Sequence, residues 1–248
     1  MNKELIRERF CKKLDSYNKN AVIQRHMAEY LVKMVDFSNI SSNGEISILE
    51  LGCGTGLLTE LVIKQISGYR EYVALDIVPE CRFYIEKIDS GIRFVSSDID
   101  KFINDSDDTK YDLIISNATF QWLDDMPYVV EKLTTKLKPN GQLVFSTFGT
   151  ENFKEIKEIL GITLNYISKN ELSRILARFN PVIKEEIKKM FFNAPIDILR
   201  HIQSTGVNAI STAVWTKSDL MNFEKEYNLV SKNNPELTYH PMYVVLKV

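Results

Sequence analysis

Apolar strand-like runs and amphipathic helical stretches alternate between residues 46 and 148. The strand-like runs are short and carry β-branched or aromatic residues; they lie at 46–51, 72–76, 92–95, 111–116 and 142–148. Between them, apolar residues recur at helical spacing, as in Leu57, Leu58, Leu61 and Val62. This alternation predicts an α/β fold that is doubly wound around a mostly parallel sheet, with ligands bound at the C-terminal ends of the strands.

The segments on either side of this core have different patterns. Residues 3–36 predict two helices, separated by a turn at residues 15–18. Beyond strand five, capping signals predict helical segments within 150–180 and 194–230, with Asn152 and Ser168 as two of the helix starts and Thr216 with Asp219 as another. Residues 182–192 and 239–248 are strand-like, and the first of these predicts one strand at the sheet edge. We expect a single domain over residues 1–248, with the 150–180 helices inserted over the site.

Composition and charge narrow the class of protein. The chain has 248 residues and a formal net charge of −2, which argues against a phosphate backbone as its main partner. Its three cysteines and three histidines are scattered, so the sequence suggests neither a disulfide framework nor a metal site. We find no apolar run long enough to span a membrane and no signal peptide. We therefore expect a cytoplasmic enzyme that binds no metal, no nucleic acid and no membrane.

Three glycines follow the first strand and precede a helix. Gly52, Gly54 and Gly56 come directly after Ile46 to Leu51, and such a loop lets the backbone approach a ligand while helix N–H groups point at it. Asp76 ends the second strand and Asp98 follows the third. Because the C-terminal ends of parallel strands meet at one edge of a sheet, these groups are predicted to share a site.

The glycine spacing separates two kinds of cofactor site. A dinucleotide fingerprint needs a glycine at position 57, where this chain has leucine. The run from Glu50 to Gly56, E-L-G-C-G-T-G, instead resembles the first motif of class I S-adenosylmethionine (SAM) methyltransferases, whose sheet has seven strands. The resemblance implies that residues 1–40 form a helical lid and that SAM contacts come from Tyr17, Gln24, Glu50, Gly52, Gly54, Gly56, Asp76, Ile77, Asp98, Ile99, Ser116 and Asn117.

Other segments resemble one family within that class. They are the S-N-x-x-x-Q-W stretch at 116–122, the spacing of Phe10, Tyr17, Gln24 and Arg25, and residues 145–147, 202–208 and 237–240. Together they are similar to the malonyl-[acyl-carrier-protein] O-methyltransferases that begin pimeloyl synthesis for biotin. The chain departs from that family at Thr205, where only Gly206 remains of a usual glycine pair.

This second resemblance implies methyl transfer to the free carboxylate of a malonyl group on acyl carrier protein or CoA. A carboxylic acid has a pKa near 4, so the nucleophile is already ionised at neutral pH and no catalytic acid or base is needed. The residues that would position the acceptor are Tyr17, Arg25, Gln121, Trp122 and His201. Carrier proteins are acidic, and the docking residues that we expect are Arg174, Arg178 and Arg200. Two alternatives stay open: a methyltransferase for a free small carboxylic acid, and a SAM- or nucleotide-binding module without turnover.

Overall fold

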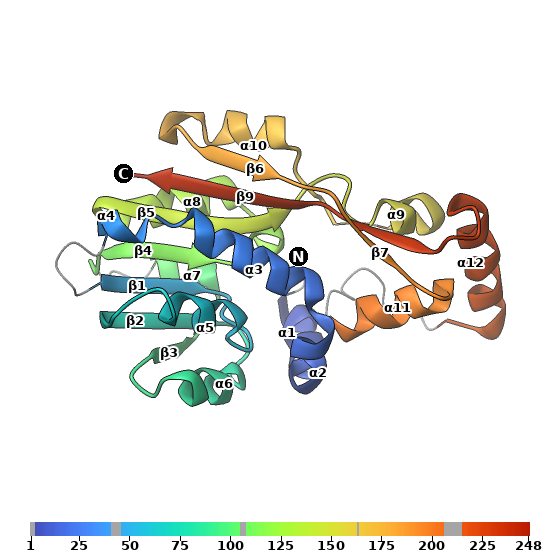
Figure 1. The fold of residues 1–248 in the computed structure, drawn as a ribbon, viewed down its shortest axis with the longest axis horizontal. Helices are drawn as coiled ribbons and strands as arrows, with labels where there is room; N and C mark the ends of the chain where they lie inside the picture. Colours follow the sequence, from blue (N-terminus) through green and yellow to red (C-terminus); the bar gives the residue numbers. More distant parts are fainter. Residues whose placement is uncertain (1–2, 41–45, 105–107, 163, 206–214) are drawn as a thin grey trace.

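A seven-stranded sheet forms the centre of the computed structural model, which describes residues 3–40, 46–104, 108–162, 164–205 and 215–248 (Figure 1). Its strand order is β3-β2-β1-β4-β5-β9-β6. The strands are β1 (Ile46–Leu51), β2 (Tyr69–Asp76), β3 (Arg93–Ser96), β4 (Tyr111–Ser116), β5 (Leu137–Phe148), β6 (Val182–Glu185) and β9 (Pro241–Lys247). Strands β1 to β5 pair in parallel, whereas β9 is antiparallel to both β5 and β6. The predicted mostly parallel, doubly wound sheet is confirmed.

Helices cover both faces of this sheet because successive strand residues point to opposite sides. Ile48 belongs to the apolar cluster beneath α3 (Val22–Met34), α5 (Leu57–Ile63) and α6 (Cys81–Ile88). Its neighbour Leu49 belongs to a second cluster, beneath α7 (Ile99–Asn104), α8 (Met126–Thr135) and α10 (Lys169–Ile175). The strands therefore present apolar residues on both faces of the sheet, and a layer of helices packs on each face.

The strand order reverses between β1 and β4. The chain runs outward from β1 through β2 to β3 and then returns to place β4 against the other side of β1. The connections that leave β1 and β4 consequently turn to opposite sides, which opens a crevice at their C-terminal ends. The glycine loop that follows β1 lies at this point.

The C-terminal hundred residues add a smaller unit beside the main sheet. Strands β7 (Lys188–Phe191) and β8 (Glu236–Tyr239) pair antiparallel, next to α9 (Lys154–Leu160), α11 (Pro195–Ser204) and α12 (Lys217–Val230), on the right of Figure 1. The prediction of one edge strand over 182–192 is therefore wrong, because the segment is two strands in two sheets. Between them, Glu186 accepts hydrogen bonds from Tyr243 Oη at 2.6 Å and pairs with His26 at 2.7 Å.

The N-terminal segment contains more helices than the two that were predicted. It forms α1 (Lys3–Cys11), α2 (Leu14–Asn20), α3 and a short α4 (Phe37–Ile40). The predicted turn at residues 15–18 is wrong, since these residues lie within α2. Tertiary contacts explain the difference: Leu14 is buried and the Tyr17 ring packs edge-on against Phe10, with 4.9 Å between ring centroids.

Two more boundaries differ from the predictions. Strand five was predicted to begin at residue 142, but β5 begins at Leu137 and includes residues 138–141, where Asn140 has φ +65°. Asn152 does not cap a helix: α9 begins at Lys154, and the Asn152 side chain instead donates to Tyr166 Oη and accepts from the His240 N–H. The cap of α12 by Thr216 and Asp219 is confirmed, and so is the Ser168 cap of α10. Two 3₁₀ turns, η1 (Phe120–Trp122) and η2 (Ala177–Phe179), complete the described elements.

A buried carboxyl group links β1, β2 and α5. Glu50 is 1% exposed, and its Oε2 atom accepts hydrogen bonds from Tyr72 Oη at 2.6 Å and Thr59 Oγ1 at 2.8 Å. Its Oε1 atom has no partner among the described residues. Burial raises the pKa of Glu50 from 4.5 to about 7, because these two hydrogen bonds only partly offset the loss of water around the charge.

We predict that this carboxyl group makes the folded protein less stable as pH rises. The pKa is higher in the folded state than in the unfolded state, so its stabilising contribution is complete below pH 4.5 and is lost as pH rises through about 7. The loss is about 3 kcal/mol from the size of that shift. Urea unfolding of Glu50→Gln between pH 5 and pH 8 should show most of this slope removed. An unchanged slope would contradict the assignment to Glu50.

Candidate functional site

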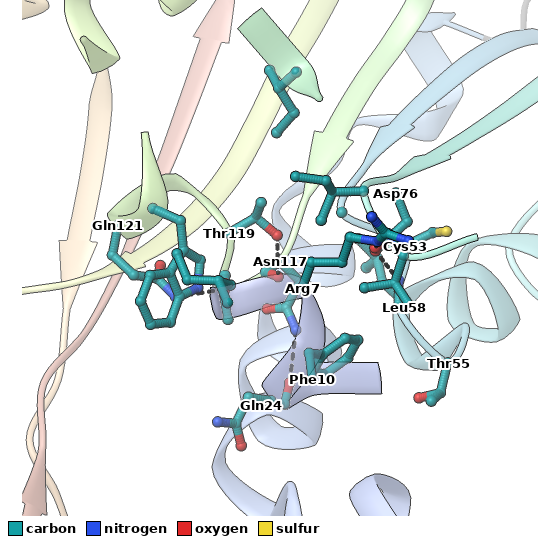
Figure 2. Close-up of a pocket in the computed structure, with 18 of the residues that line it drawn as sticks. Arg7, Phe10, Gln24, Cys53, Thr55, Leu58, Asp76, Asn117, Thr119 and Gln121 are labelled. Carbon is teal, nitrogen blue, oxygen red and sulfur yellow. Dashed lines mark hydrogen bonds between the residues drawn. The ribbon is translucent and has the colours of Figure 1, made fainter. Parts of the chain in front are cut away.

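A pocket opens at the C-terminal ends of the central strands, beneath the N-terminal helices (Figure 2). The C-terminal ends of four neighbouring strands and the residues that follow them form its floor: residues 52–55, 57 and 58 after β1, 76–78 at the end of β2, 97–99 after β3, and 117–119 and 121–123 after β4. The N-terminal helices form its roof with Lys3, Ile6, Arg7, Phe10, Tyr17 and Gln24. Phe148 and Thr205 complete the lining. The pocket thus lies where the strand order reverses.

The glycine loop needs residues without a side chain at two positions. Gly52 has φ +69°, and a Cβ atom there would lie 2.2 Å from Thr119 Oγ1. Gly54 has φ +52° and faces the pocket, with the Phe10 ring 3.3 Å from where its Cβ would be. Gly56 does not line the pocket; a Cβ atom there would meet Ile88 at 2.2 Å, so it allows α5 to pack against α6.

Asp76 is fixed at the end of β2 by the backbone around it. Its Oδ2 atom accepts the Gly54 N–H at 2.8 Å, and its Oδ1 atom accepts the Val78 N–H at 2.9 Å. Burial raises the pKa of Asp76, and the backbone hydrogen bonds oppose that rise. Each carboxylate oxygen accepts more than one hydrogen bond, so both retain capacity for a hydroxyl donor from a ligand.

An ion-pair cluster closes one edge of the pocket. Lys3 of α1 donates to Asp98 Oδ1 at 3.1 Å and also binds Asp100. Asp98, Ile99 and Lys3 all line the pocket. The acid predicted to follow β3 is therefore in the site, and it also attaches the N-terminal helix.

Two further residues of the N-terminal helices, Gln24 and Tyr17, line the pocket. Gln24 is 3% exposed, and its Oε1 atom has no partner among the described residues. Its main-chain oxygen accepts a hydrogen bond from Asn117 Nδ2 at 2.9 Å, which joins α3 to the loop after β4 (Figure 2). Burial raises the pKa of Tyr17, so its hydroxyl stays protonated and can donate a hydrogen bond.

The lining residues that come from the loop after β4 are uncharged. Gln121 Nε2 donates to the Ala118 oxygen at 2.6 Å, while Gln121 Oε1 has no partner among the described residues. Trp122, Phe148 and Thr205 also line the pocket, and Thr205 Oγ1 donates to the Ile202 oxygen at 3.1 Å. The charged side chains that line the pocket, by contrast, come from α1 and from the loops after β2 and β3: Lys3, Arg7, Asp76 and Asp98.

Several residues predicted for the site lie outside the pocket lining. Glu50 and Ser116 are buried beneath it, where Ser116 Oγ donates to the Leu51 oxygen at 2.8 Å. Arg25 is exposed on the outer side of α3. His201 contacts Tyr239 Oη at 2.8 Å, and burial lowers the pKa of its imidazole. Gly206, with the rest of 206–208, lies outside the described residues.

The arginines predicted to dock a carrier protein are also remote from the lining. Arg174 and Arg178 belong to the segment of α10 and η2 that precedes β6, and Arg178 pairs with Glu131 at 2.8 Å. Arg200 on α11 pairs with Asp197 at 2.8 Å. The helices α9 and α10, which were expected to cover the site, contribute no residue to the pocket lining.

The sequence reasoning missed several lining residues, among them Lys3, Arg7, Thr119 and Phe148. Thr119 lies at a variable position of the S-N-x-x-x-Q-W stretch, and only its contact with Gly52 reveals its place. Lys3 is separated from Asp98 by 95 residues, so no local pattern connects them. Phe148 ends β5, and no motif in the sequence connects it with the site.

Two kinds of feature are absent from the part of the chain that the structure describes. No cluster of three or more metal-ligating side chains occurs within those residues. No helix among them is both long enough and apolar enough to cross a membrane.

Comparisons with known proteins agree on one family. Residues 23–190 match the family described as a methyltransferase domain. A malonyl-[acyl-carrier protein] O-methyltransferase of Calditerrivibrio nitroreducens is 39% identical, covering 96% of this chain and 94% of that protein. The protein of the same name from Haemophilus influenzae is 32% identical, covering all of this chain and 95% of that protein.

Solved structures agree on the fold. The YcgJ protein of Bacillus subtilis superposes with a TM-score of 0.62 at 11% identity, covering 90% of this chain and 97% of that one. The plantazolicin methyltransferase BpumL, solved with SAH, gives a TM-score of 0.55 at 15% identity and covers 98% of this chain and 96% of that one. At these identities the likeness concerns the fold alone.

Proposed function

Because this chain belongs to the malonyl-[acyl-carrier protein] O-methyltransferases, we propose that it transfers a methyl group from SAM to the free carboxylate of a malonyl group carried by acyl carrier protein. The product is the malonyl methyl ester. One observation about the site supports this most directly: the loops after β2 and β3 supply the carboxylates of the lining, Asp76 and Asp98, whereas the lining residues that follow β4 are all uncharged and include the donors Gln121 and Trp122.

The residues of the cofactor half suit SAM. Gly54 leaves room for a ligand against the backbone, and Asp76 presents two oriented carboxylate oxygens to which ribose hydroxyls can donate. Asp98 and Ile99 also line the pocket, and we assign them to the adenine of SAM. When bound, SAM supplies a methyl group attached to a positively charged sulfur. Phe10 and Tyr17 cover this half and exclude water from it.

The acceptor half is suited to a nucleophile that arrives already ionised. Displacement at a methyl carbon requires in-line positioning of the carboxylate rather than removal of a proton. Tyr17, Gln121 and Trp122 each provide an uncharged donor in the lining. A donor without positive charge orients a carboxylate and leaves its negative charge available for attack. A lysine or arginine in the same place would stabilise the ground-state anion.

We propose that the reaction serves to remove the negative charge of the malonyl carboxylate. A methyl ester lacks the charge that would oppose transfer of the malonyl end into an apolar enzyme pocket. The product is therefore suited to reactions that extend an acyl chain, in agreement with a place at the start of pimeloyl and biotin synthesis. Retained binding of SAM without turnover would instead favour the binding-module alternative.

The first prediction concerns Asp76. Asp76→Ala should weaken SAM binding, because each lost hydrogen bond to a charged group is worth about 1.5–3 kcal/mol. Asp76→Asn keeps the shape of the side chain and should lose less. Calorimetric titration with SAM measures both, with circular dichroism to establish that each variant folds. Wild-type affinity in a folded Asp76→Ala protein would remove Asp76 from the site.

The second prediction concerns the acceptor. Mass spectrometry of malonyl carrier protein after reaction with SAM should show a gain of one methyl group, and acetyl carrier protein should show none because it lacks the free carboxylate. Methylation of the acetyl form, or of a protein side chain, would refute the carboxylate mechanism. Turnover of free malonate but not of the carrier-bound form would favour the small-acid alternative.

The third prediction concerns Gln121. Gln121→Glu is nearly the same size but places a negative charge beside the malonyl carboxylate, so kcat/KM for the acceptor should fall by about a hundredfold. Gln121→Met, which is neutral and similar in size, should lose less. The affinity for SAM should change little in either variant. Equal losses in Gln121→Glu and Gln121→Met would show that Gln121 does not face the carboxylate.

A further inference from the structure

The N-terminal helices carry a positive charge that the chain as a whole does not. Residues 3–25 contain seven lysines and arginines and three acids, although the full chain has a net charge of −2. Lys3 and Arg7 line the pocket together with Phe10, Tyr17 and Gln24. Lys12, Lys13, Lys19 and Arg25 do not line it, so most of the excess positive charge lies away from the pocket.

The basic side chains on the outer side are not neutralised by neighbours. Lys12, Lys19 and Arg25 are exposed and Lys13 is half-buried. None of the four forms an ion pair with another described residue. The acids of the same helices are mostly engaged elsewhere: Glu4 pairs with Arg7 at 3.3 Å, and Asp15 accepts a hydrogen bond from Tyr84 Oη at 2.7 Å. Glu8 is the remaining exposed acid of α1.

The roof is attached to the rest of the protein by polar contacts at its edges. Lys3 binds Asp98 and Asp100 at one end of α1. At α2, Asp15 binds Tyr84, and Asn18 Oδ1 accepts a hydrogen bond from Thr55 Oγ1 at 2.5 Å. These contacts fix which side of α2 faces the pocket. Lys19 near its C-terminal end and Lys12 just before it are exposed to solvent.

We propose that the basic outer face of α1 and α2, defined by Lys12, Lys13 and Lys19 with Arg25 at its border, is the docking surface for the carrier protein. This inference rests on the proposed function, which requires a small acidic protein to deliver the acceptor to the pocket. Unpaired lysines attract such a partner and raise its rate of association. Because one helix is about 10 Å across, a protein docked here lies one helix thickness from the pocket.

The position of this face favours it over the arginines of α10 and η2. Lys12 and Lys19 flank α2, whose Tyr17 lines the pocket. Arg174 and Arg178 belong to a segment with no residue in the lining, and Arg178 is already paired with Glu131. In Figure 1 the strands β6 and β9 lie between α10 and the pocket, so a carrier protein bound to α10 would be separated from it by them. A carrier protein bound to α2 would contact a helix that itself lines the pocket through Tyr17.

Matched double charge reversals test the assignment. Lys12→Glu/Lys19→Glu and Arg174→Glu/Arg178→Glu make the same change in net charge at two exposed places. Fluorescence anisotropy with labelled acetyl carrier protein, which is not methylated, measures docking independently of turnover. The reversal on α1 and α2 should raise the Kd by about tenfold or more, and the wild-type Kd should rise between about 50 and about 300 mM salt. The affinity for SAM should stay within about twofold in both variants.

Each other outcome overturns the assignment. Equal losses in both double variants would indicate a response to net charge alone, and a loss confined to Arg174→Glu/Arg178→Glu would move the dock to that segment. A loss of SAM affinity that parallels the loss of docking would show that the two lysines support the roof. If the glutamate variant does not fold, Lys12→Gln/Lys19→Gln provides the same comparison. Failure of the wild-type enzyme to methylate malonyl carrier protein would refute the proposed function, a result that the docking measurement does not depend on.

Discussion

Close approach of the backbone at the end of β1 is the constraint on which the site depends. Gly52 and Gly54 have positive φ, and a side chain on Gly52 would overlap Thr119. Their conformation brings the Gly54 N–H to Asp76, so one hydrogen bond both shapes the loop and orients the acid. The reversal of strand order on the two sides of β1 leaves this loop uncovered by the sheet. The N-terminal helices are needed to close the pocket from the other side.

The sheet and the N-terminal helices that cover the pocket are held by different kinds of contact. The sheet and its layers are held by two apolar clusters that run under the helices on each face. In α1 and α2, by contrast, only Leu14 is fully buried, with Phe10 and Cys11 packed partly against the same cluster. The remaining contacts are polar and partly exposed: Lys3 with Asp98, Asp15 with Tyr84 and Asn18 with Thr55. Exposed ion pairs and hydrogen bonds each add little stability. The roof is therefore less firmly fixed than the floor beneath it, which suits an element that must admit a ligand.

The sequence predicted the floor of the site better than the roof. Gly52, Gly54 and Asp76 could be placed together because parallel strands bring their C-terminal ends to one edge. Lys3 could not, since its partner lies 95 residues away and neither residue belongs to a repeated pattern. Asn152 illustrates the same limit: it resembles a helix cap, but its side chain is taken by Tyr166 and by the backbone at His240. Arg25 belongs to the family-like N-terminal spacing and His201 immediately precedes the family-like segment 202–208, yet neither lines the pocket.

The attachment of Lys3 has a consequence for how the protein is made. Translation produces α1 and α2 before any strand of the sheet, but Asp98 and Asp100 leave the ribosome 95 and 97 residues later. Until then Phe10 and Leu14 have no completed surface to pack on, so α1 and α2, although synthesised before the sheet, are among its last partners to settle. Contacts between distant residues slow folding because a long loop must close first. The nascent chain therefore completes this domain only after α1 and α2 fold back over the finished strands.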